Sequence, residues 1–486
     1  MKKTFTLLLL IFSLSVSAQS QITWSMGMNI ASSASGNQHP RVATDAAGNP
    51  LVLWGNANRA MFSRWNGSAF TAPVMINPMT IPVAHGNWMG PDIASHGDTV
   101  YVVFKQTPEG DSTSHVYIIR SFNGGMSFSP ATRIDFIGDS ISRFPTVTTD
   151  ASGNPIVGFM KFNSSFLESR WVVAKSSDFG NTFSADVKAS GWSSISSTVC
   201  DCCPGSITSS GSKVAVPYRD NNANMRDIWA GISSDGGSTF TQGLAVDQGF
   251  WLVMSCPASG PDAAIINDTL YTVYMSASAG PTFVWMSKTS LLSMTASTGA
   301  ALTGMFTGLS GQNYPRIAAD GNALAIVWEQ TVNSTVQLPL FFTNNINSGL
   351  PAAYDTVDLN DITNADVALA NGKIFVVWED DNSGTVKYRK GSYNVSTSVP
   401  SLENNFSFAV QQNPVAGNIL KIQFSDFLNA KAEYTITNLL GQDLIHSAAG
   451  VQSKKMNINI SSLAPGTYFL TIISGNKSFV SKIIRL

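Results

Sequence analysis

A short apolar segment that ends in an aromatic residue recurs seven times in this chain. The steps between successive aromatics are 50 to 59 residues, and the copies end at Trp54, Phe104, Phe159, Tyr218, Tyr274, Trp328 and Trp378. A period of this size is typical of propellers, solenoids and arrays, whose units bury their apolar faces only against one another. The repeat therefore constrains the architecture more than any other feature of the sequence.

Each aromatic segment follows an inner segment that usually opens with proline. These prolines are Pro40, Pro91, Pro145, Pro204, Pro261 and Pro315, and the seventh copy, NADVALANG, has none. A Gly/Asn/Asp turn joins the two segments, and a third short run rich in Val, Ile and aromatics follows. The body of the sequence has no convincing helical periodicity. We expect an all-β β-propeller over 19–390, with seven four-stranded blades favoured and six as the alternative.

The seventh unit ends near Lys390 without a fourth strand, whereas Ile22–Ile30 precedes the first unit and belongs to none. A ring that closes through this N-terminal segment removes two exposed strand edges. We therefore expect Ile22–Ile30 to pair with the last blade.

A polar turn follows the third run of several units. It reads SSDFGNTF at Ser176–Phe183 and SSDGGSTF at Ser233–Phe240, with looser copies at Ser121–Phe128 and Ser63–Phe70. The pattern S-x-D-x-G-x-T-F resembles the Asp-box (BNR repeat), and the body resembles sialidase-like Asp-box propellers. The box residues are Asp178, Gly180, Asp235 and Gly237. The carboxylate can accept hydrogen bonds from its own turn and glycine permits positive φ, so the box is a folding device and does not itself indicate activity.

The two ends of the chain predict export. Residues 1–18 combine Lys2 and Lys3 with an apolar run and a small-residue cut site before Gln19, as in a secretory signal peptide. No segment is long and apolar enough to predict a membrane span. Removal of the leader takes away two lysines and changes the net charge from −2 to −4. The chain therefore lacks the excess of basic residues that is typical of nucleic-acid-binding proteins.

A separate small domain ends the chain. After a Ser/Val/Asn-rich linker at 391–404, residues 405–486 form alternating strands, for which we expect a small β-sandwich. Asn413-Pro414, Leu439–Gln442, Leu463–Tyr468 and Lys482–Leu486 resemble the type A C-terminal sorting domain of type IX secretion in Bacteroidota. The resemblance implies a Gram-negative cell, partnership with the type IX machinery, removal of the domain by a sortase, and release or attachment at the outer cell surface. An ordinary β-sandwich appendage is the alternative.

Topology places any functional site on one face of the ring. Loops that enter the inner strands and loops that leave the second strands share that face, opposite the Asp-box turns. Charged residues make up 12% of the chain, yet this face is rich in them. The candidate binding residues are His39, Trp88, Asp92, Arg143, Arg226, Asp227, Trp251, Asp262 and Glu379. Ordinary solvation of polar loop residues is the competing explanation.

All four cysteines are expected on this face, at Cys200, Cys202, Cys203 and Cys256. In an exported protein two disulfides are the simplest interpretation. Adjacent Cys202 and Cys203 pair poorly with each other, so one of the cluster should reach Cys256 and link the fourth and fifth blades. A thiolate site for Zn or Cu(I) is the alternative. The sequence predicts no other cofactor.

Two classes of function fit these features. The first is an exo-acting, sialidase-like glycoside hydrolase, which would use Arg41, Arg219 and Arg316 on a substrate carboxylate, with Tyr314, Glu329 and Asp220 as partners. The chain only approximates the Arg-Ile-Pro signature of active sialidases, with HPRVATD and YPRIAADG. The second, which we favour, is a binding module for glycans or surface proteins, because fold does not fix function.

Overall fold

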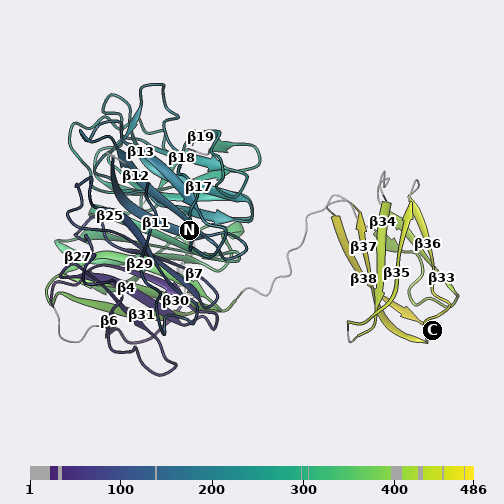
Figure 1. The fold of residues 1–486 in the computed structure, drawn as a ribbon. Coiled ribbons are helices and arrows are strands. Elements are labelled where there is room, and N and C mark those ends of the chain that lie inside the picture. Colours follow the sequence, from purple (N-terminus) through teal and green to yellow (C-terminus); the bar gives the residue numbers. More distant parts are fainter. Residues whose placement is uncertain are drawn as a thin grey trace, which may run out of the picture. The chain divides into compact units, whose positions relative to one another are not determined.

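The computed structural model describes residues 22–30, 35–136, 140–296, 298–304, 306–395, 408–424, 431–439, 441–450, 454–474 and 477–486. The predicted signal peptide at 1–18 and most of the predicted linker lie outside these residues. The chain divides into two compact units, Met1–Ser396 and Thr397–Leu486, drawn in Figure 1. Each unit is described by itself.

The N-terminal unit contains seven antiparallel sheets, one for each sequence repeat. Blade 1 consists of β3 (Gln38–Thr44), β4 (Pro50–Asn56), β5 (Arg59–Arg64) and β6 (Val74–Met75). Blade 2 consists of β7 (Asp92–His96), β8 (Thr99–Lys105), β9 (Val116–Ser121) and β10 (Thr132–Arg133). Blade 3 consists of β11 (Ile141–Thr149), β12 (Pro155–Phe162), β13 (Arg170–Lys175) and β14 (Val187–Lys188).

The fourth and fifth blades each contain an extra short strand. Blade 4 consists of β15 (Thr198–Val199), β16 (Thr208–Ser210), β17 (Lys213–Asn221), β18 (Ile228–Ser233) and β19 (Gln242–Ala245). Blade 5 consists of β20 (Asp262–Ile266), β21 (Thr269–Ser276), β22 (Phe283–Ser290), β23 (Thr295–Ala296) and β24 (Ala300–Ala301). β15 and β16 both pair with β17, so the inner edge of blade 4 is interrupted at the cysteine cluster.

The last two blades complete the ring. Blade 6 consists of β25 (Leu309–Asp320), β26 (Ala323–Val332), β27 (Thr335–Thr343), the 3-10 turn η1 (Ile346–Ser348) and β28 (Asp355–Leu359). Blade 7 consists of β29 (Ile362–Ala370), β30 (Lys373–Asp380) and β31 (Thr385–Ser392), with β1 (Thr23–Trp24) and β2 (Met28–Asn29) on its outer edge. Both N-terminal strands pair antiparallel with β31, which confirms the predicted closure by Ile22–Ile30.

The blades form a closed ring around a central axis. The inner strands contact one another in the order β3, β7, β11, β16, β20, β25 and β29, and β29 returns to β3. The N-terminal unit is therefore a seven-bladed β-propeller, which confirms the favoured prediction over six blades. Each of the seven repeated aromatics ends a buried second-strand segment and is at most 1% exposed. The repeat in the sequence therefore marks residues that are buried by the packing of one blade against the next.

The S-x-D turns lie at the opposite end of the blades from the inner-strand entries. In blade 3 the start of β12 pairs with the end of β13, where one of these turns begins. Asp178 accepts hydrogen bonds from Ser176 Oγ at 2.8 Å and from Thr182 N at 2.9 Å, and Gly180 has φ of 82°. These hydrogen bonds, first among them that from the Thr182 backbone, lower the pKa of Asp178 to about 2. Asp235 repeats the arrangement with Ser233 and Thr239 in blade 4, where Gly237 has φ of 83°.

The C-terminal unit is a small β-sandwich. One sheet contains β32 (Phe408–Val410), β33 (Ile419–Phe424) and β36 (Lys455–Asn459). The other contains β34 (Lys431–Thr437), β35 (Asp443–Gly450), β37 (Gly466–Ser474) and β38 (Lys477–Arg485). Leu420, Ile458, Leu470 and Ile472 lie fully buried between the two sheets. In neither unit do the described residues include a helix of the length and apolarity needed to cross a membrane.

Candidate functional site

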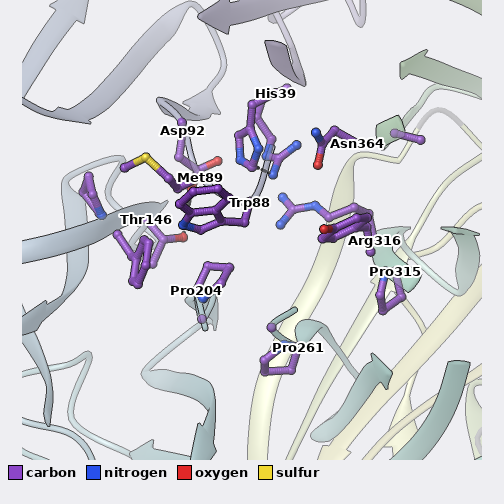
Figure 2. Close-up of a pocket in the computed structure, with 18 residues that line it drawn as sticks. His39, Trp88, Met89, Asp92, Thr146, Pro204, Pro261, Pro315, Arg316 and Asn364 are labelled. Carbon is purple, nitrogen blue, oxygen red and sulfur yellow. Dashed lines mark hydrogen bonds between the residues drawn. The ribbon is translucent and has the colours of Figure 1, made fainter. Parts of the chain in front are cut away.

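A pocket lies where the inner strands of all seven blades begin. It holds about 660 Å³ of space not filled by atoms, open solvent included. Figure 2 shows Trp88 and Arg316 extending toward the middle of this pocket. Among its lining residues are His39 and Arg41 of blade 1, Trp88, Gly90 and Asp92 of blade 2, Phe144 and Thr146 of blade 3, Pro204 and Gly205 of blade 4, Gly260 and Pro261 of blade 5, Tyr314 and Arg316 of blade 6, and Asn364 and Ala365 of blade 7.

Four residues that line the pocket have positive φ at the entry of an inner strand. They are His39 (56°), Phe144 (50°), Tyr314 (47°) and Asn364 (52°), and each falls within an irregularity of the strand register. Bulky residues rarely adopt this conformation, and bulges of this kind re-aim side chains. Three of the four precede a proline of the repeat. The pocket is therefore built by the same local distortion, repeated in four blades.

Three carboxylates tie neighbouring inner strands together, and of these Asp92 lines the pocket. Asp92 accepts from Val147 N at 3.1 Å, Asp262 from Ile317 N at 3.0 Å, and Asp366 from Val42 N at 2.9 Å. The last of these bonds crosses from blade 7 to blade 1 and so spans the closure of the ring.

Arg316 is held by two of these carboxylates. Its Nε lies 2.9 Å from Asp366 Oδ1 and 3.4 Å from Asp262 Oδ2. Burial opposes the charge of the guanidinium, but Asp262 and Asp366 outweigh burial and raise the pKa of Arg316 above its ordinary value. Burial in turn raises the pKa of Asp262. Arg316 is thus a fixed cation at the pocket wall.

Arg41 is the second arginine of the pocket, and it has no ion pair with a carboxylate among the described residues. It is 8% exposed, Nη1 donates to Pro40 O at 2.8 Å, and Nη2 contacts His39 Nε2. Burial and then the nearby Arg316 lower the pKa of Arg41 to about 10, so it remains charged at neutral pH. Burial and Arg41 also hold the pKa of His39 well below its usual value, and His39 Nδ1 has no hydrogen-bond partner. The pocket therefore holds an incompletely neutralised cation beside an unsatisfied ring nitrogen.

Glu329 is close to Tyr314, and of the two only Tyr314 lines the pocket, on its blade 6 side. β25 and β26 pair Asn313 with Glu329, next to the bulge that carries Tyr314. Burial, then the charges of Glu329 and Cys203, raise the pKa of Tyr314. Burial, then the charges of Asp381 and Glu379, raise the pKa of Glu329 to about 8. Glu379 supports the neighbouring wall, because it accepts from His39 N and from Asn364 Nδ2, each at 3.2 Å.

The remaining candidate residues on blades 4 and 5 do not line this pocket. Arg219 is 1% exposed and donates to the carbonyls of Ser259, Arg226 and Met275 at 2.7 to 3.1 Å. Its guanidinium also lies 5.1 Å from the Trp251 ring centroid. Arg41 and Arg316 therefore share a pocket, whereas Arg219 lies in a separate buried group.

Two carboxylates accompany that group. Burial raises the pKa of Asp220 to about 6 and also raises the pKa of Asp227. Asp220 accepts from Ser193 Oγ, and Asp227 accepts from Trp251 N at 2.7 Å. These hydrogen bonds fix the loops around the cysteines.

The four cysteines meet in the interruption of the blade 4 inner edge. Cys202 and Cys256 form a disulfide with Cα atoms 6.3 Å apart, which confirms the predicted link between blades 4 and 5. Cys200 and Cys203 are both buried, and their sulfurs lie 2.7 Å apart. All four sulfurs lie within 4.8 Å of one another, so the residue types alone could also hold a soft metal ion.

Arg143 connects this loop to blade 2. Nη2 donates to Glu109 Oε2 at 2.7 Å and Nη1 donates to Asp201 O at 2.9 Å. Its guanidinium also lies 4.5 Å from the Phe144 ring centroid. Arg143 thus braces the cysteine loop instead of lining the pocket.

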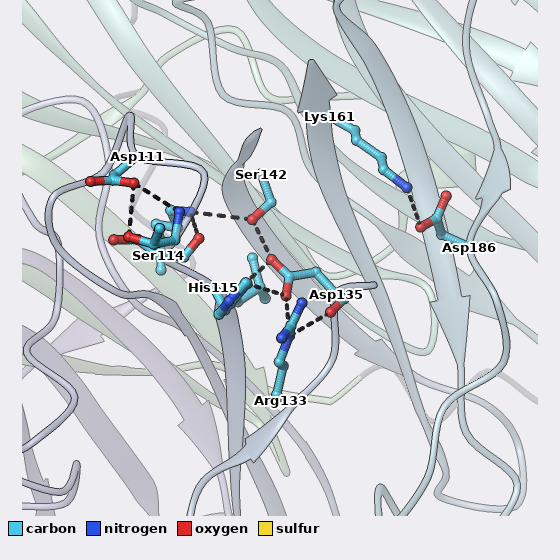
Figure 3. Close-up of polar contacts among 11 residues, drawn as sticks. Asp111, Ser114, His115, Arg133, Asp135, Ser142, Lys161 and Asp186 are labelled. Atoms are coloured by element: carbon cyan, nitrogen blue, oxygen red, sulfur yellow. Dashed lines mark hydrogen bonds and ion pairs between the residues drawn. The ribbon is translucent and has the colours of Figure 1, made fainter. Parts of the chain in front are cut away.

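A buried polar network anchors the start of β11 (Figure 3). Lys105 is 1% exposed and donates to Ser114 O and to Ser142 Oγ, and Ser142 in turn donates to Asp135. Asp135 also lies 3.1 Å from Arg133 Nε and from His115 Nδ1. Burial lowers the pKa of Lys105 to about 8. Because Lys105, Asp135 and Ser142 are each at most 1% exposed, we assign the network a structural role.

Sequence reasoning missed several residues of the pocket, namely Met89, Phe144, Thr146, Asn364 and Asp366. A signal for two of them was present. Phe144 precedes a repeat proline and Thr146 follows it, in the positions that His39 and Arg41 occupy in blade 1. Aligning the blades position by position would have placed both at the pocket.

The C-terminal unit matches a known family. Residues 413–485 match the model described as a secretion system C-terminal sorting domain. The chain therefore carries such a domain, which implies the type IX secretion machinery and supports secretion or export to the cell surface. No curated protein matches the chain.

Solved structures resemble the chain only distantly. A Dyadobacter fermentans protein of unknown function is 12% identical, with 77% of this chain and 100% of that chain covered and a TM-score of 0.45. Trypanosoma rangeli sialidase in complex with sialic acid is 10% identical, with 96% and 88% covered and a TM-score of 0.41. Penicillium chrysogenum α-L-arabinanase with arabinobiose is 11% identical, with 76% and 98% covered and a TM-score of 0.40. Similarity at this level assigns neither an activity nor a ligand.

Proposed function

We propose that this protein is an exported, sialidase-like propeller whose central pocket binds an anionic glycan, or a protein that carries one, at the cell surface. The observation that carries the proposal is Arg41, a buried cation without a carboxylate partner among the described residues. Asp366, Asp92 and Asp262 act on the charge of Arg41 only from beyond ion-pair distance, so a ligand anion that contacts its guanidinium directly would be favoured. The unpartnered His39 Nδ1 offers a neighbouring polar contact.

The other walls of the pocket suit a sugar. Trp88 is 41% exposed, which leaves its ring available to an apolar sugar face. Thr146 and Asn364 supply short polar groups nearby. A pocket with mixed apolar and polar walls and a few fixed charges is typical of small-ligand sites.

Calorimetric titration of the mature propeller tests this function. We expect N-acetylneuraminic acid or glucuronic acid to bind, and glucose to bind much more weakly. Arg41→Met should remove the preference for the acidic sugar, whereas Arg59→Met, at an exposed arginine of β5, should leave it unchanged. Equal binding of acidic and neutral sugars, or binding unaffected by Arg41→Met, would contradict the proposal.

A second candidate function is exo-acting glycoside hydrolysis. The observation that favours it is Tyr314, whose phenol lines the pocket and senses the charge of Glu329. A tyrosine nucleophile assisted by a glutamate is what sialidases use, and Asp92, which lines the same pocket, would be needed as acid in place of Asp220, which does not. Release of fluorophore from a fluorogenic sialoside, abolished by Tyr314→Phe, would establish this function. Binding of the sialoside without release of the fluorophore would favour the non-catalytic binding module instead.

Export is the third part of the proposal. The sequence pattern favours a signal peptide at 1–18, passage through type IX secretion in a Gram-negative member of the Bacteroidota, and removal of residues 405–486 by a sortase. Truncation before Asn405 should leave the propeller in the periplasm, detected by fractionation and immunoblotting. Unchanged export of the truncated chain would reject the role of the tail.

A further inference from the structure

A second cavity, here called the seam cavity, lies where blade 7 meets blade 1. It holds about 430 Å³ of space not filled by atoms, open solvent included. Its walls include Pro50 and Trp65 of blade 1 and Lys373, Phe375, Tyr388 and Lys390 of blade 7. Pro50 begins β4 and Lys373 begins β30, and both strands start at the end of the blades opposite the inner-strand entries. The seam cavity is therefore remote from the pocket already described.

Two lysines share the blade 7 wall of the seam cavity. β30 and β31 pair Lys373 with Ser392 and Phe375 with Lys390, so the two lysines occupy diagonal positions on one face of the sheet. Long side chains at such positions are within reach of each other, and like charges there repel. Both lysines are half-buried, and neither has an ion pair with a carboxylate among the described residues. Lys387, on the other face of β31, is by contrast paired with two aspartates.

Blade 1 supplies a tryptophan at the position where the Asp-box has its carboxylate. In the looser copy Ser63–Phe70, Trp65 corresponds to Asp178 of blade 3. The turn is held instead by Asn66, whose Oδ1 accepts from two backbone N–H groups of the turn at 3.0 Å each. Trp65 therefore has no part in the turn's hydrogen bonds, and its half-buried ring lines the seam cavity. The replacement also removes a carboxylate that would repel an anion there.

Aromatic packing fixes Trp65 relative to the two lysines. The Trp65 ring lies edge-to-face with Phe70, with 5.4 Å between centroids, and Phe70 lies edge-to-face with Tyr388 at 4.9 Å. Tyr388 in turn stacks on Phe375 at 6.3 Å. These contacts cross from blade 1 to blade 7, so the wall is already formed without a ligand. An aromatic wall beside two ammonium groups suits a ring that has an apolar face and an anionic substituent.

We propose that the seam cavity is a second ligand site, which binds a sugar through a sulfate or phosphate ester. The ammonium groups of Lys373 and Lys390 act as point charges that suit a tetrahedral oxyanion, whereas the forked guanidinium groups of the pocket suit a planar carboxylate. The Trp65 ring contacts the apolar face of the sugar. A bound oxyanion offsets the repulsion between the lysines. The inference does not depend on the function proposed for the pocket, because the two sites share no lining residue.

Calorimetric titration of the mature protein with glucose 6-sulfate, glucose 6-phosphate and glucose tests the site. We expect saturable binding of at least one ester, and the tighter of the two identifies the source of the oxyanion. Glucose should bind roughly tenfold more weakly or less. Combining Lys373→Gln with Lys390→Gln should weaken ester binding by a similar factor. Lys175→Gln, at a half-buried lysine that ends the third strand of blade 3, should leave it unchanged.

Two further variants separate the parts of the site. Trp65→Leu should weaken binding of the ester but not of inorganic phosphate or sulfate, which have no ring to contact the indole. Arg41→Met, in the pocket, should leave ester binding in the seam cavity intact. The proposal is overturned if neither ester binds, if glucose or the inorganic ion binds as tightly as the ester, or if ester binding survives the double lysine substitution and is lost in Arg41→Met.

Discussion

The propeller face contains two groups of arginines in contrasting environments. At the pocket, Arg316 is paired with Asp262 and Asp366, and Arg41 is next to it without a carboxylate of its own. Between blades 4 and 5, Arg219 donates to three backbone carbonyls and Arg226 donates to a sulfur. The first group borders open space, whereas the second is enclosed by protein.

The difference shows that a shared face does not make a shared site. Arg41 and Arg316 each follow a repeat proline at the entry of an inner strand, whereas Arg219 is near the end of a second strand. An inner strand lies beside the axis of the ring and a second strand lies one strand farther out. Arg219 is therefore farther from the axis than Arg41 and Arg316. Position within the blade, more than residue type, decides which arginine meets a ligand.

The largest expected effect comes from breaking the arginine–carboxylate ion pair at the pocket, an interaction that Arg219 and Arg226 do not make among the described residues. Asp366→Ala should destabilise the propeller by about 3–5 kcal/mol in total, because it removes the nearer ion-pair partner of Arg316, leaving only Asp262 at 3.4 Å, and also leaves Val42 N without its acceptor across the ring closure. Denaturant unfolding of the mature propeller measures the change.

A surface pair supplies the control for this variant. Asp358 and Lys387 are 33% and 30% exposed, and Asp358→Ala should cost under about 1 kcal/mol. Equal losses for Asp358→Ala and Asp366→Ala would mean that the pocket ion pair contributes no more than a surface pair.

The disulfide between blades 4 and 5 tests the other group. Cys256→Ser opens a link between residues 54 apart in sequence and should destabilise the propeller by about 2–4 kcal/mol. The exposed neighbour Ser255 gives the control, since Ser255→Ala should leave the unfolding midpoint unchanged. Full stability of Cys256→Ser would mean that Arg143 and Arg219 hold the cysteine loop without the disulfide.

Much of the fold was accessible from the sequence because its signals are periodic. The seven aromatics recur at the same place in each blade, and all are buried. The unpaired seventh unit and the unassigned Ile22–Ile30 predicted the closure, and blade-to-blade adjacency predicted a link from the cysteine cluster to Cys256, which the structure makes through Cys202. Each of these predictions needed only the order of the units around a ring.

The pocket was less accessible because its geometry depends on backbone irregularities. Phe144 and Asn364 reach the axis through positive φ, and neither carries a charge that would mark it in the sequence. Asp366 lies in the seventh unit, which lacks the proline that marks the other inner strands. Arg41 and Arg316 also line the pocket whereas Arg219 is buried elsewhere, and no spacing in the sequence predicts this difference.

The smallest expected effect concerns the pH dependence of the pocket wall. The pKa of Glu329 is raised to about 8 in the folded protein, from an ordinary value near 4.5, chiefly by burial. Between these two values the folded state binds more protons than the unfolded state, so the contribution of Glu329 to stability falls as pH rises. Glu329→Gln removes this dependence.

Since the side chain of Glu329 is half-buried and partly screened, we expect the Glu329→Gln variant to be about 1–3 kcal/mol more stable than the wild type at pH 9 and little changed at pH 5. Thermal unfolding at both pH values measures the difference. Glu168→Gln, at an exposed glutamate, should show no such pH-dependent gain. A Glu329→Gln gain of the same size at pH 5 and pH 9 would show that Glu329 is already ionised at pH 5 in the folded protein. A protonated carboxyl near the pocket would then no longer distinguish this region from the enclosed arginines of blades 4 and 5.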